Sequence, residues 1–116
     1  TRAANAAYCV AVDDPANVPA YVKALYAQQP KENTAGLDDA TLASVATSVG
    51  ASDAVASCIQ DGTYTRFVTA MTARTPLQEG ATGIATPTIV VNGTTLNNKP
   101  DLTGDPQKDI VGRLNG

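Results

Sequence analysis

All 20 alanines of this 116-residue chain lie at or before Ala85. Alanine is the strongest helix former, and it suits short helices that pack closely. The segment after Ala85 is instead rich in β-branched residues, asparagine, glycine and proline. This shift predicts two parts, a helical lobe over residues 1–82 and a short β-containing lobe over residues 83–116.

The charge and residue content exclude several functions. The net charge is −3, so the chain has no basic surplus for binding a phosphate backbone, and we expect no nucleic-acid partner. The absence of histidine removes histidine-based catalysis and histidine-ligated metals, and we expect neither a metal nor a cofactor. No apolar run reaches the roughly 18 residues of a membrane span, so we expect no transmembrane segment in this chain.

The supply of large apolar residues is small. Leucine, isoleucine, valine and phenylalanine together number 23 of 116, which is at the edge of what folds unaided. Such a chain would benefit from a covalent cross-link or from a partner.

Helical spacing of apolar residues predicts five helices in the first lobe. The first helix ends at Asp13, and the second carries an apolar stripe over 18–26. The third runs from Asp39 to Val49, the fourth runs from Ser52 to Ile59, and the fifth begins near Thr63. The same spacing predicts that the aromatic side chains of these helices are core residues: Tyr8, Tyr21, Tyr26, Tyr64 and Phe67. The segment from Thr75 to Gln78 matches a capping box, so we expect a kink or a new helical turn there.

The second lobe is predicted to form a β-hairpin followed by a helix. The β-branched run over 88–91 is typical of a buried strand, and Asn92-Gly93 favours a type I′ turn with a return strand over 94–96. Asp105-Pro106 is typical of a helix start, and Ile110, Val111 and Leu114 would form the apolar stripe of that last helix.

The two cysteines, Cys9 and Cys58, are 49 positions apart and each lies on an apolar helical face. A catalytic dithiol usually holds its second sulfur close in sequence, as in Cys-x-x-Cys, and this spacing is absent. We interpret the pair as a structural disulfide; the alternatives are two buried free thiols or a redox or metal role. A persistent disulfide would place the protein outside the cytosol.

The segment Ala85-Thr86-Pro87-Thr88 directly precedes the predicted strand. A cis Thr86-Pro87 bond would let the Thr86 backbone N–H and C=O face outward, where they could pair with an extended peptide. Base rates alone favour an ordinary trans proline at this position.

The run from Gly83 to Gly93 resembles a segment of DsbA-like thiol–disulfide oxidoreductases, which are thioredoxin-fold proteins of the bacterial envelope. The segments at 3–10 and 24–30 are similar to the helical insertion of actinobacterial members. The resemblance implies an α/β fold, in which a helical insertion accompanies the C-terminal half of a thioredoxin sheet, namely its hairpin and final helix. It also implies a cis proline at Pro87, a substrate-binding role for Ala85, Thr86 and Pro87, and a structural disulfide in the helical insertion. Ala85 stands where the family usually has glycine.

The resemblance further implies a catalytic Cys-x-x-Cys unit, which we expect before residue 1. Without it this chain alone would be inactive and would hold no catalytic residue. The substrates would be cysteine-containing proteins or peptides outside the cytoplasm. The strand over 88–91 would have an open edge, which we expect either the N-terminal unit or a second copy of the chain to cover.

Two other functions stay open from the sequence. The chain could belong to a non-catalytic, DsbA-like binding or sensor ectodomain of a membrane protein. It could also be a secreted helical module without a site, for which a trans Thr86-Pro87 bond would be the expected sign.

Overall fold

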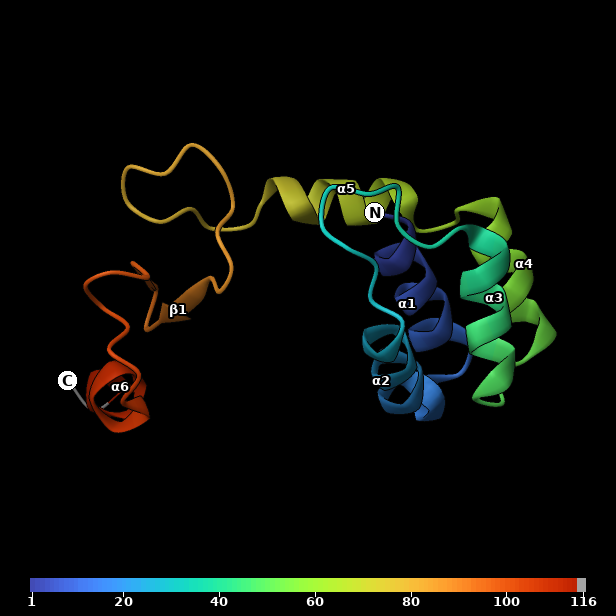
Figure 1. The fold of residues 1–116 in the computed structure, drawn as a ribbon, viewed down its shortest axis with the longest axis horizontal. Coiled ribbons are helices and arrows are strands. Elements are labelled where there is room, and N and C mark those ends of the chain that lie inside the picture. The colour runs from blue at the N-terminus through green and yellow to red at the C-terminus, as the bar shows by residue number, and fades with distance from the viewer. Residues whose placement is uncertain (115–116) are drawn as a thin grey trace. The chain divides into compact units, whose positions relative to one another are not determined.

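The computed structural model of this chain describes residues 1–114 (Figure 1). It contains two compact units, Thr1–Ala73 and Arg74–Gly116, which we call the helical unit and the second unit. The composition shift places the division later, between residues 82 and 83. The assignment of residues 1–82 to a helical insertion and of residues 83–116 to half of a thioredoxin sheet stays a prediction. Residues 115 and 116 lie outside the described residues.

The helical unit contains the five expected helices. They are α1 (Arg2–Asp13), α2 (Val18–Ala27), α3 (Asp39–Ser48), α4 (Asp53–Asp61) and α5 (Thr65–Ala73), with a 3-10 turn over Pro15–Asn17. Helix α1 contacts each of the other four, so it forms the centre of the unit.

Local residue chemistry sets two of the helix ends. Asp38 precedes α3, and its carboxylate accepts a hydrogen bond of 2.8 Å from the Thr41 N–H. Hydrogen bonding from Thr41 lowers the pKa of Asp38. Gly62 ends α4 with φ of 62°, a left-handed conformation that glycine adopts without steric cost.

The core of the helical unit lies around α1, α3 and α4. Its buried members are Ala6, Cys9, Val10, Tyr21, Leu42, Ala43, Val45, Ala46, Val55 and Ile59. Tyr21 is fully buried, and its hydroxyl donates a 3.1 Å hydrogen bond to the Leu42 carbonyl. Burial raises the pKa of Tyr21 to about 12, so the phenol stays neutral near neutral pH.

A buried polar side chain, Asn5, joins α1 to the corner between α4 and α5. Its Nδ2 donates to the Ile59 carbonyl at 3.4 Å, and its Oδ1 accepts from the Tyr64 N–H at 2.7 Å. Asn5 is only 2% exposed. Both ends of this amide are therefore paired, as a buried polar group requires.

The prediction that all the helical aromatics are core residues is wrong for three of them. Tyr8, Tyr26 and Phe67 are 38%, 71% and 46% exposed, whereas Tyr21 is fully buried. The Phe67 ring instead meets the Tyr8 ring edge-on, with centroids 4.9 Å apart. Helical spacing identifies the apolar side of a helix, but it does not show how much of that side a neighbouring helix covers.

The second unit contains the predicted hairpin, built from β1 (Ile89–Val91) and β2 (Thr94–Leu96). The strands are antiparallel, and Ile89 lies opposite Leu96. The turn residues Asn92 and Gly93 have φ of 49° and 79°, as a type I′ turn requires.

The predicted last helix is present in a shorter and less buried form. A π-helical turn covers Gln107–Val111, and α6 covers Gly112–Leu114. Two residues of the predicted apolar stripe, Val111 and Leu114, are 38% and 55% exposed. A two-stranded hairpin offers too little surface to cover the stripe.

Neither the kink nor the new helical turn expected at Pro76 is present, because α5 ends at Ala73 and residues 75–88 form neither helix nor strand. Gln78 has no capping role there. Its side chain instead makes two hydrogen bonds to distant parts of the second unit.

Candidate functional site

The segment formed by Ala85, Thr86, Pro87 and Thr88, which we call the Thr86 loop, leads directly into β1. The peptide bond between Thr86 and Pro87 is cis. Thr86 and Pro87 are exposed, and Ala85 and Thr88 are half-buried. All three residues that the sequence suggested for substrate binding therefore lie on one continuous stretch at the start of a strand.

Hydrogen bonds engage two of the carbonyl groups in this loop. The Thr88 hydroxyl donates to the Ala85 carbonyl, and the Gln78 Nε2 donates to the Pro87 carbonyl at 3.3 Å. Between them, the Thr86 N–H and C=O have no hydrogen-bond partner within residues 1–114. The loop thus presents an unpaired backbone donor and an unpaired backbone acceptor together on Thr86, which is exposed.

A free donor and acceptor on one exposed residue can bind an extended peptide in the manner of strand addition. Backbone hydrogen bonds of this kind supply affinity without requiring a particular side chain. Within the described part of the chain, β1 pairs only with β2, so its other edge is also unpaired. The arrangement can therefore hold a polypeptide backbone.

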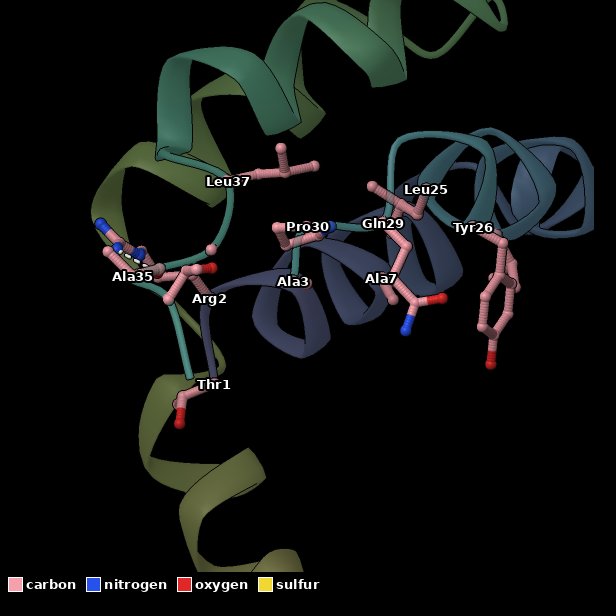
Figure 2. A pocket seen from close by; sticks show the side chains of 13 residues that line it. Thr1, Arg2, Ala3, Ala7, Leu25, Tyr26, Gln29, Pro30, Ala35 and Leu37 are labelled. Atoms are coloured by element: carbon pink, nitrogen blue, oxygen red, sulfur yellow. Dashed lines mark hydrogen bonds between the residues drawn. The ribbon is translucent and has the colours of Figure 1, made fainter. Parts of the chain in front are cut away.

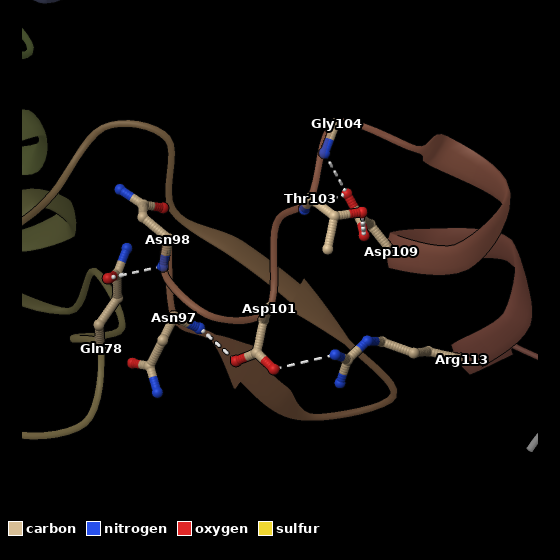
Figure 3. A network of polar contacts seen from close by, with 8 residues as sticks. All are labelled: Gln78, Asn97, Asn98, Asp101, Thr103, Gly104, Asp109 and Arg113. Carbon is tan, nitrogen blue, oxygen red and sulfur yellow. Dashed lines mark hydrogen bonds and ion pairs between the residues drawn. The ribbon is translucent and has the colours of Figure 1, made fainter.

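A polar network stabilises the part of the second unit that follows the hairpin (Figure 3). Asp101 accepts from the Asn97 N–H at 2.8 Å and pairs with the Arg113 guanidinium at 2.9 Å. Hydrogen bonding from the Asn97 backbone lowers the pKa of Asp101 more than the Arg113 pairing does. The network joins the end of β2 to the C-terminal helical segment.

Asp109 forms the second centre of this network. The carboxylate is 5% exposed and accepts from the Thr103 N–H and hydroxyl, both at 2.7 Å, and from the Gly104 N–H at 2.9 Å. Hydrogen bonding from Thr103 lowers the pKa of Asp109. The neighbouring loop is thereby fixed against the last helical segment.

The two cysteines form the disulfide that the sequence predicted. Cys9 in α1 and Cys58 in α4 are bonded, with their Cα atoms 5.8 Å apart, and Cys9 is fully buried. In the part of the chain that is described, neither sulfur is a free thiol. The pair belongs to the helical unit and the Thr86 loop to the second unit, so the residues fall into two separate groups.

A cavity of about 510 Å³ lies in the helical unit beside α1, α2 and the loop that follows α2 (Figure 2). Its walls include Ala7, Val22, Leu25 and Leu37. Arg2 lies at one end, where its guanidinium donates to the Ala35 carbonyl at 2.9 Å. The cavity is lined by none of the site residues predicted from the sequence, which are Cys9, Cys58, Ala85, Thr86 and Pro87.

The described residues offer neither a clustered set of metal ligands nor a membrane-spanning helix. Over residues 1–114, no three acidic or cysteine side chains are grouped so as to hold a metal ion. Over the same residues, no helix combines the length and apolar character needed to cross a bilayer.

Sequence reasoning missed Gln78 and Asn97 as parts of the second unit's framework. The Asn97 Oδ1 accepts from the Glu79 N–H at 3.1 Å, and Gln78 bonds the Thr86 loop as described. The available signal was one glutamine ahead of the hairpin and two asparagines, Asn97 and Asn98, directly after it, and these residues also fit ordinary turns.

Comparison with known families gives one match. The family described as thioredoxin matches residues 1–104, which is most of the chain. No curated protein and no solved structure was found to match the sequence.

Proposed function

The chain belongs to the thioredoxin family, and on that premise we propose that it is part of a DsbA-like protein dithiol–disulfide oxidoreductase of actinobacterial type. The family supports a redox or disulfide-related role. The finer assignment rests on the resemblance of the run from Gly83 to Gly93 and on the exposed backbone of the Thr86 loop.

The proposed contribution of this chain is to bind the substrate backbone. The observation that supports it is the exposed Thr86, whose backbone N–H and C=O are unpaired between two engaged carbonyls, those of Ala85 and Pro87. A cysteine-containing segment of a client protein would pair with Thr86 as an added strand. The helical unit would be the insertion that accompanies this site.

The proposed exchange chemistry belongs to a Cys-x-x-Cys unit elsewhere in the complete protein. There, a client thiolate attacks the Cys-x-x-Cys disulfide and releases one of its sulfurs as a thiolate. A second client thiolate then attacks the mixed disulfide, which leaves the client oxidised and the Cys-x-x-Cys pair reduced. Cys9 and Cys58 take no part in this exchange, because they form the structural bond of the helical unit.

The second unit supports the proposal that another surface covers it. Its only buried hydrophobic residues are Val91 and Leu96 among those described. Five large apolar side chains in it are exposed: Leu77, Ile84, Val90, Val111 and Leu114. We propose that the Cys-x-x-Cys unit, or a second copy of the chain, pairs with the open edge of β1 and covers these residues.

The proposed location is extracytoplasmic. The disulfide between Cys9 and Cys58 supports this, because reducing compartments keep most protein thiols reduced.

Oxidation of a reduced two-cysteine peptide tests the function. The complete protein is expected to consume the peptide's thiols, and the 116-residue chain alone is expected not to. A complete protein that binds the peptide without oxidising it would contradict the oxidoreductase proposal. That result would support the alternative, a non-catalytic binding or sensor ectodomain of a membrane protein.

A further inference from the structure

The Gln78 side chain connects the Thr86 loop to the end of the hairpin. Its Nε2 donates to the Pro87 carbonyl at 3.3 Å. Its Oε1 accepts from the Asn98 N–H at 3.1 Å, which Figure 3 shows. Asn98 lies two residues after β2 ends at Leu96. One amide group therefore joins two segments that lie 9 and 20 residues from it in the sequence.

A second set of bonds holds the Gln78 segment in place. The Glu79 N–H donates to the Asn97 Oδ1 at 3.1 Å, so two adjacent residues bond to two adjacent residues after β2. The Asn97 N–H is in turn held by Asp101 at 2.8 Å. Gln78 is thus held both through the backbone of Glu79 and through its own Oε1. These two contacts fix the direction of its Nε2 donor.

We infer that Gln78 is the positioning residue of the Thr86 loop, because it occupies the Pro87 carbonyl beside Thr86 and holds the loop in which the unpaired Thr86 N–H and C=O can meet an extended peptide. This inference rests on the proposed function of the loop. Without the Gln78 donor, the Pro87 carbonyl becomes a second free acceptor next to Thr86. The loop also loses its connection to Asn98, so Thr86 is no longer held in one orientation.

Two substitutions separate the two hydrogen bonds of Gln78. Gln78→Leu removes both of them, whereas Gln78→Glu keeps an acceptor for the Asn98 N–H and removes the donor to Pro87. The matched controls are Gln60→Leu and Gln60→Glu, because Gln60 is an exposed glutamine on α4 in the helical unit. All four variants are made in the full 116-residue chain with the disulfide intact.

The experiment is an NMR titration of each chain with a blocked, uncharged pentapeptide rich in valine, followed at the Thr86 amide. The wild-type chain and both Gln60 variants are expected to show the same shift of this amide and the same dissociation constant. Loss of one neutral hydrogen bond corresponds to a rise in dissociation constant of about fivefold, which we expect as a minimum for both Gln78 variants. The Pro87 carbonyl carbon resonance should also move in both Gln78 variants before any peptide is added.

The amide resonances of Val91 and Leu96 show whether the hairpin is folded in each variant. Gln78→Glu keeps the Asn98 connection, so it serves as the test if Gln78→Leu disrupts the hairpin. Equal affinity of the wild-type chain and Gln78→Glu, with the Thr86 amide shifting in both, would overturn the role of Gln78 and leave the peptide site standing. A wild-type chain whose Thr86 amide does not respond to the peptide would overturn the peptide site, and the role of Gln78 with it.

Discussion

Removing the disulfide between Cys9 and Cys58 should cost the helical unit a large part of its stability. The bond closes a loop of 49 residues between α1 and α4. In the chain-entropy account, a cross-link of that span stabilises the folded state by about 4 kcal/mol, because it restricts the unfolded chain. The perturbation is reduction of the bond, or the double substitution Cys9→Ala and Cys58→Ala.

This magnitude is large for a unit of this size. The helical unit covers 73 residues, from Thr1 to Ala73. Typical domains have a free energy of unfolding of about 0.05–0.15 kcal/mol per residue, which gives about 4–11 kcal/mol here. Losing about 4 kcal/mol would therefore remove between about one third and all of the free energy of unfolding of the unit.

Urea unfolding followed by far-ultraviolet circular dichroism measures the effect, because most of the helix belongs to this unit. The oxidised chain, the chain with reductant and the double-alanine variant are compared. Reductant should leave the double variant unchanged, which controls for effects unrelated to the bond. If the reduced chain unfolds with a free energy within about 1 kcal/mol of the oxidised chain, the entropic argument is refuted.

Four further changes test the contacts described above. Asn5→Ala should lower the free energy of unfolding by about 1–3 kcal/mol in urea titrations, because it leaves the partly buried Tyr64 N–H unpaired. Gly62→Ala should lower it by about 1 kcal/mol by the same measurement, because alanine disfavours a left-handed φ of 62°. The pKa of Tyr21 is raised, so the folded state holds the phenol proton more tightly than the unfolded chain does. In thermal melts, this contribution to stability should be complete below pH 10.0 and should decline as the pH rises toward about 12. Tyr21→Phe should abolish that decline. The pKa of Asp109 lies below the ordinary 3.8, so the unfolded chain takes up this proton first as the pH falls. Amide NMR should show that the second unit loses stability below pH 3.8. Asp109→Asn should lose less stability over the same pH range.

The helices and the hairpin could be predicted because short-range chemistry determines them, and the disulfide could be predicted because the chain has only two cysteines to pair. The Asn92-Gly93 pair fixes both the turn and the strand register, since few residues adopt two consecutive positive φ values. Asp38 begins α3 through its side-chain cap, and Gly62 ends α4 through its left-handed backbone. Each of these helix ends depends on the chemistry of a single residue.

The features that sequence reasoning missed depend on long-range neighbours. Tyr26 and Phe67 lie on apolar stripes, yet their exposure depends on how far the neighbouring helices extend. Gln78 fits a capping box by position, but its partners are Pro87 and Asn98, which no local pattern relates to it. The candidate site was predicted at Ala85, Thr86 and Pro87, whereas the hydrogen bonds that leave Thr86 unpaired required the folded second unit.

The disulfide also has a topological consequence for the exposed loop between α2 and α3. Residues 28–38 lie within the covalent ring that Cys9 and Cys58 close. A protease that cuts this loop once opens the ring without separating the chain into two molecules. The nicked protein keeps its mass apart from one added water, and it divides into two polypeptides only when a reductant breaks the sulfur–sulfur bond.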